Sequence, residues 1–247
     1  MPFSTLRSSK LRSVRRSVLP ALLAVIGVTW QLASCAAETP VNVPAPAMDN
    51  PKQQGAFQTA VLSGGCFWGV QGVYEHVKGV EKVVSGYAGG DRSTAQYEAV
   101  SRGTTGHAES VQITFDPAKV SYGELLQIFF SVVHDPTQLN RQGPDTGTQY
   151  RSAIVYSDDT QKTIAAAYIA QLSKAGVFRQ PIVTRVDHLR GFYPAESYHQ
   201  DYLVHNPSNP YIAYNDLPKI ENLKRVFPNY YSDRPVLLAA SGSANQK

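Results

Sequence analysis

The sequence predicts a single α+β domain with helices packed on a mixed β-sheet, and three observations carry this prediction. Segments of alternating apolar and polar residues, typical of strands, are interspersed with segments that repeat apolar residues at helical spacing. The two kinds of segment follow no strict strand–helix–strand rhythm, which favours α+β over α/β. The chain has 247 residues, of which 43% are hydrophobic and 17% charged, so it can bury one sizeable core.

Each element follows from a local pattern. Glycines, Asp116 and Pro117 bound the strands, which we predict over residues 58–62, 80–87, 107–115, 153–156 and 182–186. Apolar residues at helical spacing predict a helix that opens at Cys66 and ends at Gly79. Ser121 and Glu124 have the spacing of a capping box. The remaining predicted helices begin at Ser121, at Asp158 or Asp159 (ending near residue 174), and at Glu196 (ending at residue 205).

The first 34 residues have the pattern of an export signal. A basic start is followed by a short apolar run over residues 18–29 and then by Leu32-Ala33-Ser34-Cys35. That tetrapeptide resembles the lipobox of bacterial lipoproteins, which implies cleavage before Cys35 and a lipid on its sulfur. An ordinary signal peptide and an uncleaved anchor are the alternatives. We therefore expect an exported, membrane-anchored lipoprotein that faces the periplasm or the cell exterior and meets the membrane only through its lipid.

Composition divides the rest of the chain. Residues 35–57 are rich in proline and lack apolar periodicity, so we predict a disordered tether there. The folded, catalytic domain should span residues 58–235, and residues 236–247 should form a flexible tail. We expect a monomer.

Charge and cysteine content exclude several classes of protein. The net charge is +4, but residues 1–34 hold five basic and no acidic side chains, so the remainder carries −1. The basicity belongs to the leader, and we expect no nucleic-acid partner. Two cysteines cannot form a disulfide scaffold or a four-cysteine zinc site. The histidines show no metal-ligand spacing, so we expect no metal.

Two side chains have the chemistry of a reactive site. Cys66 lies between Gly65 and Phe67 at the first turn of a predicted helix, where unpaired N–H groups should lower the pKa of a thiol. The alternative is a buried structural cysteine. Glu109 shares the apolar face of its predicted strand with Val111, so burial should raise the pKa of its carboxyl. The alternative is a strand end that turns Glu109 into solvent.

Seven motifs stand in order along the chain, and together they resemble the peptide methionine sulfoxide reductase A family. The similarity runs from about residue 59 to residue 230. The motifs are Gly64-Gly65-Cys66-Phe67-Trp68-Gly69, Gly86-Tyr87-Ala88-Gly89-Gly90, Gly106-His107-Ala108-Glu109, Phe115-Asp116-Pro117, His134-Asp135-Pro136, Gly147-Thr148-Gln149-Tyr150-Arg151-Ser152 and Tyr198-His199-Gln200.

The resemblance implies a fold, an activity and a set of roles. The fold would be a two-layer, ferredoxin-like plait, and the activity the thiol-dependent reduction of methionine-S-sulfoxide, free or in proteins, through a cysteine sulfenic acid. Cys66 would attack the sulfoxide sulfur, and Glu109 would protonate its oxygen. The substrate-binding side chains would be Phe67 and Trp68 around the methyl group, Tyr87 and Tyr150 on the oxygen, and Asp145 in support.

The cysteine content also bears on how Cys66 is returned to a thiol after each reaction. No cysteine follows Cys66, so an internal resolving thiol is missing unless Cys35 serves. We expect no bound cofactor and an external reductant, either a small thiol or a thioredoxin-like protein. A papain-like hydrolase is the main rival, because His199 follows Cys66 by 133 residues. A lipid-anchored binding module with an unreactive Cys66 is the other.

Overall fold

The computed structural model describes Met1 and residues 39–238. The predicted signal peptide, Cys35 and residues 239–247 of the predicted tail therefore lie outside the described residues. Within residues 39–238 no helix combines the length and the apolar character that crossing a bilayer requires.

A six-stranded mixed sheet organises the domain, in the order β7-β6-β1-β3-β2-β8. Neighbouring strands are antiparallel except for the parallel pair β6 and β7. The strands are β1 Gln58–Gly64, β2 Val80–Ala88, β3 Ala108–Phe115, β6 Ser152–Tyr156, β7 Arg185–His188 and β8 Phe192–Pro194. A separate two-stranded ribbon joins β4 Arg141–Gln142 to β5 Asp145–Thr146. The α+β class and the mixed sheet are confirmed.

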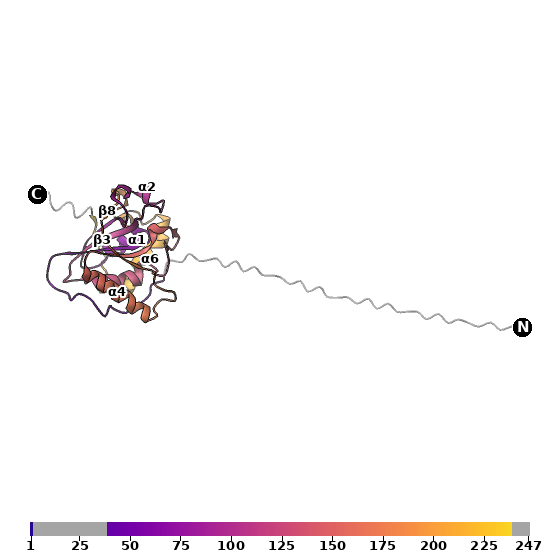
Figure 1. Ribbon diagram of the computed structural model, residues 1–247, viewed down its shortest axis with the longest axis horizontal. Coiled ribbons are helices and arrows are strands. Elements are labelled where there is room, and N and C mark those ends of the chain that lie inside the picture. The colour runs from indigo at the N-terminus through magenta and orange to yellow at the C-terminus, as the bar shows by residue number, and fades with distance from the viewer. Residues whose placement is uncertain (2–38, 239–247) are drawn as a thin grey trace. The chain divides into compact units, whose positions relative to one another are not determined.

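Helices cover the face of the sheet that carries the main core. α1 packs on β1, β2 and β3, and α4 packs on β6 and β7. In Figure 1, α4 lies at the lower edge of the domain, and α2 and β8 lie at the upper edge. The helices are α1 Phe67–Glu75, α2 Tyr97–Val100, α3 Tyr122–Ile128, α4 Asp159–Lys174, α5 Tyr202–His205 and α6 Leu217–Val226. Shorter turns are η1 Arg92–Thr94, η2 Phe129–Val133, η3 Thr148–Tyr150, η4 Ser197–His199 and η5 Ile212–Asp216.

Two predicted helix starts are confirmed by their capping hydrogen bonds. The Ser121 hydroxyl accepts from the Glu124 N–H, and the Glu124 carboxylate accepts from the Ser121 N–H, which completes the capping box of α3. Asp158 caps α4 by accepting from the Gln161 N–H at 2.8 Å.

Three local predictions are wrong in part. The helix predicted over residues 196–205 is split into η4 and α5 because Asp201 adopts a left-handed conformation, with φ of 53°. The strand predicted over residues 182–186 begins instead at Arg185. The first helix ends at Glu75, before Gly79. The helix α6 was not predicted.

Residues 39–57 are not the disordered tether that their composition predicts. They form no helix or strand, but Val43 is buried, with 1% of its surface exposed. The Val41 N–H donates to the Ser131 carbonyl at 2.9 Å, and the Tyr168 hydroxyl donates to the Pro44 carbonyl at 2.6 Å. Asp49 accepts from the Gly123 N–H at 2.8 Å, at the start of α3. Prolines prevent regular structure here, but the segment still buries one apolar side chain and hydrogen-bonds to the domain.

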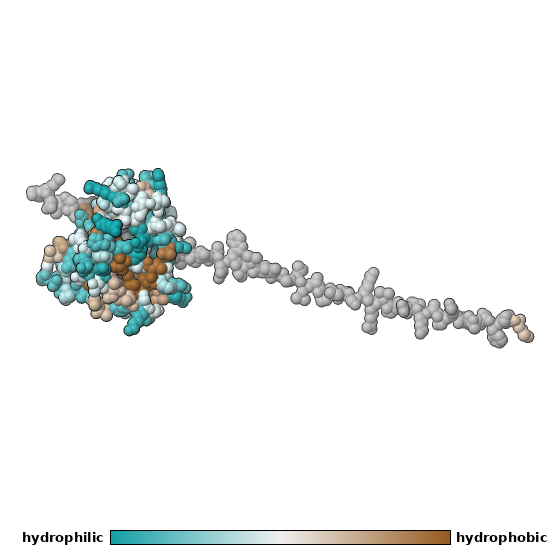
Figure 2. Space-filling view, viewed as in Figure 1, coloured by the Kyte–Doolittle hydropathy of each residue, from teal (hydrophilic) through white to brown (hydrophobic). Residues whose placement is uncertain are grey.

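The predicted tail also begins with an ordered strap. The Val236 N–H donates to the Glu75 carbonyl at 2.9 Å, and the Leu238 N–H donates to the Asp201 carboxylate at 3.0 Å. The folded unit therefore extends three residues beyond the predicted boundary at residue 235. Figure 2 shows one face of the domain, where mostly hydrophilic side chains surround a hydrophobic area.

Candidate active site

Cys66 is the N-cap residue of α1, as the sequence predicts, and lies just after β1. Gly65 makes the turn between them with φ of 94°, a conformation that strongly favours glycine. A Cβ at Gly65 would lie 2.6 Å from the Gln142 side chain, so the residue before Cys66 cannot carry a side chain without moving Gln142. Cys66 as a whole residue is partly exposed, and within residues 39–238 it forms no disulfide.

Glu109 lies on the buried face of β3, with 3% of its surface exposed. Its Oε2 accepts the backbone N–H of Phe67 at 3.0 Å, which ties it to the first residue of α1. Burial raises the pKa of Glu109 to about 8 against the opposing effect of this hydrogen bond, and the negative charges of Asp145 and Asp216 raise it further. The predicted burial and raised pKa of Glu109 are confirmed, and the carboxyl is protonated at neutral pH.

The prediction of a lowered thiol pKa is wrong. Burial raises the pKa of Cys66 well above its ordinary value, and the nearby carboxyls of Glu109, Asp216 and Asp145 raise it further. The hydrogen bond from the Trp68 N–H acts in the opposite direction but is outweighed. The start of α1 therefore does not hold a resting thiolate, because desolvation and like charge oppose the helix terminus.

Aromatic rings wall the site beside Cys66. Trp68 stacks on Tyr202 with 4.0 Å between ring centroids, and its Nε1 donates to His199 Nδ1 at 3.2 Å. Phe67 packs against His199 with 5.1 Å between centroids. These contacts fix the rings of the two residues that follow Cys66, and the substrate-binding role expected of them stays a prediction.

His199 does not pair with the thiol. Trp68 occupies its Nδ1, and its Nε2 has no hydrogen-bond partner within residues 39–238. A papain-like hydrolase needs a cysteine–histidine pair, so this arrangement argues against that rival.

Tyr87 does not present its hydroxyl to the thiol. The hydroxyl donates to the Glu196 carboxylate at 2.9 Å, and the side chain is fully buried. A phenol has one proton to donate, so Tyr87 cannot also donate to a substrate oxygen, and the role predicted for it is wrong. Tyr97 packs against His199 with 4.5 Å between ring centroids. Burial raises the pKa of its phenol, and the charges of Glu109 and Cys66 raise it further.

Asp145 begins β5 and Tyr150 ends η3, on the loop around the β4–β5 ribbon, and their expected roles stay predictions. Burial raises the pKa of Tyr150, and the charges of Glu109, Asp145 and Cys66 add to this effect. Asp145 accepts a very short hydrogen bond from the Tyr211 hydroxyl, and its burial raises its pKa. Tyr211 is absent from the predicted set, because nothing in its local sequence distinguishes it from a packing residue.

Asp216 is the second site residue that sequence reasoning missed. It is fully buried, and its Oδ1 pairs with Lys219 Nζ at 3.2 Å, while its Oδ2 has no partner within the described part of the chain. A Cβ at Gly69 would lie 2.1 Å from Asp216 Oδ1, so that glycine lets the carboxyl lie against α1. Asp216 and Lys219 are three residues apart, the spacing of an ion pair on a helix, but no helix was predicted from the sequence in this segment.

No group of three histidine, cysteine or acidic side chains in residues 39–238 is arranged to hold a metal. His134 illustrates the role of the buried histidines. Its Nε2 lies 2.7 Å from the Ser152 hydroxyl and its Nδ1 lies 3.1 Å from the Phe129 carbonyl, and burial lowers its pKa to about 3. It is a neutral histidine that joins η2 to β6.

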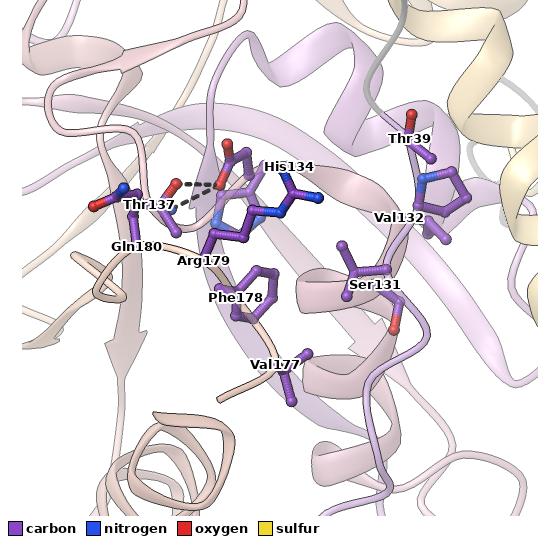
Figure 3. A pocket seen from close by; sticks show the side chains of 12 residues that line it. Thr39, Ser131, Val132, His134, Thr137, Val177, Phe178, Arg179 and Gln180 are labelled. Carbon is purple, nitrogen blue, oxygen red and sulfur yellow. Dashed lines mark hydrogen bonds between the residues drawn. The ribbon is translucent and has the colours of Figure 1, made fainter. Parts of the chain in front are cut away.

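A cavity of about 420 Å³ opens beside His134 but does not reach Cys66. Thr39, Val132, Phe178 and Arg179 are among its lining residues (Figure 3). The Asp135 carboxylate in its wall accepts from the N–H and hydroxyl of Thr137, at 2.9 and 2.7 Å, shown as dashed lines in Figure 3. Its acidic group is thus satisfied internally, and the reactive groups remain those around Cys66.

The site therefore combines a soft nucleophile, a protonated carboxyl and phenol donors beside a wall of aromatic rings that partly shields them from water. A thiol attacks sulfur readily. A protonated carboxyl and O–H donors stabilise an oxygen that gains negative charge as its bond to sulfur breaks. The arrangement suits reduction of a neutral S=O group beside a small apolar substituent.

Comparison with known proteins agrees with this chemistry. The family model "Peptide methionine sulfoxide reductase" matches residues 58–230. Over 196 residues the chain is 60% identical to "Peptide methionine sulfoxide reductase MsrA 2" of Mesorhizobium japonicum, covering 79% of this chain and 100% of that protein. It is 53% identical over 195 residues to a protein of the same name from Synechocystis, covering 78% and 89% of the two chains.

A solved structure shares the fold. It is methionine sulfoxide reductase A of Corynebacterium diphtheriae, with a TM-score of 0.54 and 32% sequence identity, covering 71% of this chain and 91% of that one. The residues that the family model matches include the whole six-stranded sheet, Cys66 and Glu109. This chain belongs to the peptide methionine sulfoxide reductase A family and is a peptide-methionine (S)-S-oxide reductase that repairs oxidised methionine.

Proposed function

We propose that Cys66 carries out this reduction as the nucleophile and that Glu109 is the acid. The observation that carries the proposal is the hydrogen bond from the Phe67 N–H to Glu109 Oε2, at 3.0 Å. It places the carboxyl at the start of the helix that Cys66 caps and leaves Oε1 to hold the proton. Phe67 and Trp68 receive the methyl group of the substrate.

The proposed step balances in protons and electrons. Cys66 Sγ forms a bond to the sulfoxide sulfur while Glu109 donates its proton to the sulfoxide oxygen. The S–O bond and the new Sγ–S bond then break as the hydroxyl passes to Sγ, giving methionine and a sulfenic acid on Cys66. The substrate sulfur gains two electrons and Sγ loses two. The thiol proton replaces the one that Glu109 gave, so no net proton is consumed.

Three phenols complete the proposed site. Tyr97 and Tyr150 donate hydrogen bonds to the sulfoxide oxygen as it gains charge. Burial raises the pKa of both phenols, and the charges of Glu109 and Cys66 add to it, which supports a place beside the reacting groups. Tyr211 and Asp145 form a hydrogen-bonded pair that supports the pocket rather than donating to the substrate.

We propose an external thiol, such as a thioredoxin-like protein, as the reductant that restores Cys66. The sequence holds one other cysteine, Cys35, and the proposed lipid would occupy its sulfur. Two thiols are needed to reduce a sulfenic acid to a thiol, with release of water and a disulfide. A dithiol protein or two small thiols supply both. The substrates would be free methionine sulfoxide and oxidised proteins and peptides.

The fold supports a finer classification. With the turns, α2 and the β4–β5 ribbon taken as insertions, β1, α1, β2, β3, α3 and β6 form a βαββαβ series, and their strands stand in the antiparallel order β6-β1-β3-β2. This series and order are those of a ferredoxin-like plait, extended here by β7 and β8. We propose that classification, with the helices of the main core as the second layer.

We also propose that the chain is exported as a monomeric lipoprotein, attached to the membrane through Cys35 alone. The basic start, the apolar run and the Leu-Ala-Ser-Cys sequence support this. Mass spectrometry of the mature protein tests it: the expected N-terminus is a lipid-modified Cys35, and an unmodified or uncleaved N-terminus would contradict the proposal.

A stereospecific assay tests the proposed site. The protein with a thiol reductant should reduce the S epimer of a peptide methionine sulfoxide and leave the R epimer untouched. One asymmetric wall of Phe67 and Trp68 faces one fixed acid, so only one epimer places both methyl group and oxygen correctly. Equal rates on the two epimers would contradict the arrangement.

A further inference from the structure

A pocket of about 360 Å³ lies on the side of the sheet away from Cys66. Ala153 and Val155 belong to a small apolar cluster separate from the main core, which marks the second face of the sheet. In the β6–β7 register Ala153 pairs with Arg185 and Val155 pairs with Asp187, so these two charged residues share that second face. Both line the pocket.

Arg151 forms the buried wall of this pocket, with 8% of its surface exposed. Its Nη1 donates to the carbonyls of His107 and Thr148, at 3.0 and 2.8 Å, and its Nη2 donates to the Gly106 carbonyl at 2.9 Å. Its Nε has no hydrogen-bond partner, and no carboxylate pairs with it, within residues 39–238. Carbonyls accept from its Nη1 and Nη2 groups but bring no negative charge, and Asp187 compensates the guanidinium only at longer range, which is costly for a buried ion.

Two more arginines add positive charge. Arg185 is paired with Asp187, at 3.0 Å from Nε to Oδ2 and 3.1 Å from Nη2 to Oδ1. Arg190 lines the same pocket, is exposed, and has no ion-pair partner in the described part of the chain. Three guanidinium groups against one carboxylate give these four side chains a net charge of +2 at the pocket.

Glycines keep part of the wall free of side chains. Gly89 and Gly106 line the pocket with φ of 101° and 78°. A Cβ at Gly89 would lie 2.8 Å from Arg151 Nη2, so a side chain there would crowd the guanidinium. No side chain at Gly89 or Gly106 therefore covers this part of the pocket wall.

We propose that this pocket binds a phosphate group, either as free phosphate or at the end of a phosphate ester. A phosphate group carries about −1.5 to −2 at neutral pH, which matches the local charge of +2. Guanidinium groups bind phosphate oxygens through paired N–H donors. The charge of −1 on the chain beyond its leader excludes an extended basic stripe, but not a local cluster of this kind. The proposal concerns the opposite face of the sheet and does not depend on the roles of Cys66 and Glu109.

Titration of the full mature protein with sodium phosphate at constant ionic strength tests the proposal. Calorimetry should show one site per chain, and the melting temperature should rise with phosphate concentration. Arg190→Gln should weaken binding by about tenfold, as loss of one charge-assisted contact implies. Asp187→Asn should tighten it by about threefold, because a negative charge leaves the pocket. Arg179→Gln, an exposed arginine outside this pocket, is the matched control and should bind like the parent.

Arg190→Gln and Asp187→Asn should change the phosphate affinity in opposite directions, which a general loss of folding could not produce. All three variants should retain the melting temperature of the parent in chloride buffer and reduce peptide sulfoxide at the parent rate. Glycerol 3-phosphate as the titrant should bind with the same variant pattern if the pocket accepts esters; binding of inorganic phosphate alone assigns it to the free ion. Absence of a phosphate site, or equal affinities in Arg190→Gln, Asp187→Asn and Arg179→Gln, would overturn the proposal.

Discussion

Replacement of Glu109 by glutamine removes the proposed acid without changing the shape of the side chain. The amide oxygen of the introduced glutamine can still accept the Phe67 N–H, which lies 3.0 Å from Oε2 in the parent. At pH 7 a carboxyl with a pKa of about 8 is about nine-tenths protonated, whereas a pKa of 4.5 would leave about 0.3% in that form. Burial therefore increases the population of the acid by about 300-fold. We expect Glu109→Gln to lower kcat by about 10²-fold at pH 7.

The pH profile separates lost acid chemistry from general damage. A group that must be protonated gives a rate that falls as pH rises through its pKa, so the parent should lose activity above pH 8. The difference in kcat between the parent and Glu109→Gln should narrow as the pH approaches 10. Loss of the Glu109 charge should also make Cys66 easier to ionise, so iodoacetamide should alkylate the variant faster than the parent at pH 9. Equal kcat values at pH 7, or an unchanged gap from pH 7 to pH 10, would refute the assignment of Glu109.

Two further predictions concern a corrected site residue and the N-terminal segment. Tyr97→Phe should lower kcat by about 10-fold to 10²-fold through loss of one O–H donor. Tyr87→Phe should cost about 1–3 kcal/mol of stability through loss of its hydrogen bond to Glu196, and it should change kcat less than about threefold. Urea denaturation measures the stability of both variants, and steady-state kinetics measures their kcat. A larger loss of kcat in Tyr87→Phe than in Tyr97→Phe would restore Tyr87 as the donor. Val43→Ala should destabilise the domain by about 1–2 kcal/mol, because a valine with 1% exposure loses its buried methyl groups. The exposed neighbour Asn42→Ala is its control, and identical urea midpoints for the two would mean that residues 39–57 are unpacked in solution.

Local patterns predicted the elements that hold the reacting groups. Strand alternation placed Glu109 on the buried face of β3, and the glycine-flanked start of an apolar helix placed Cys66 at its N-cap. The capping box of Ser121 and Glu124 fixed the start of α3. These features depend on residues within a few positions of one another, which is the range over which periodicity and capping operate.

Features set by distant contacts could not be predicted in this way. The carboxylate that holds Tyr87 belongs to Glu196, 109 positions away, and Asp145 meets Tyr211 across 66 positions. The thiol pKa depends on the same kind of contact, because Asp216 reaches Cys66 only through the packing of η5 on α1. The effect of a helix N-terminus, taken by itself, predicts a lowered pKa for the Cys66 thiol, whereas these distant contacts raise it.

A single turnover without reductant tests the central claim most directly. The mature protein, mixed with excess peptide methionine-S-sulfoxide and then treated with dimedone, should form one reduced methionine peptide per chain and carry the label on Cys66. Cys35→Ser in a leaderless chain should behave identically, because the sulfenic acid is resolved from outside. Cys66→Ser should form no reduced peptide. A disulfide between Cys35 and Cys66 after that turnover, or methionine formed without any oxidation of Cys66, would contradict the mechanism.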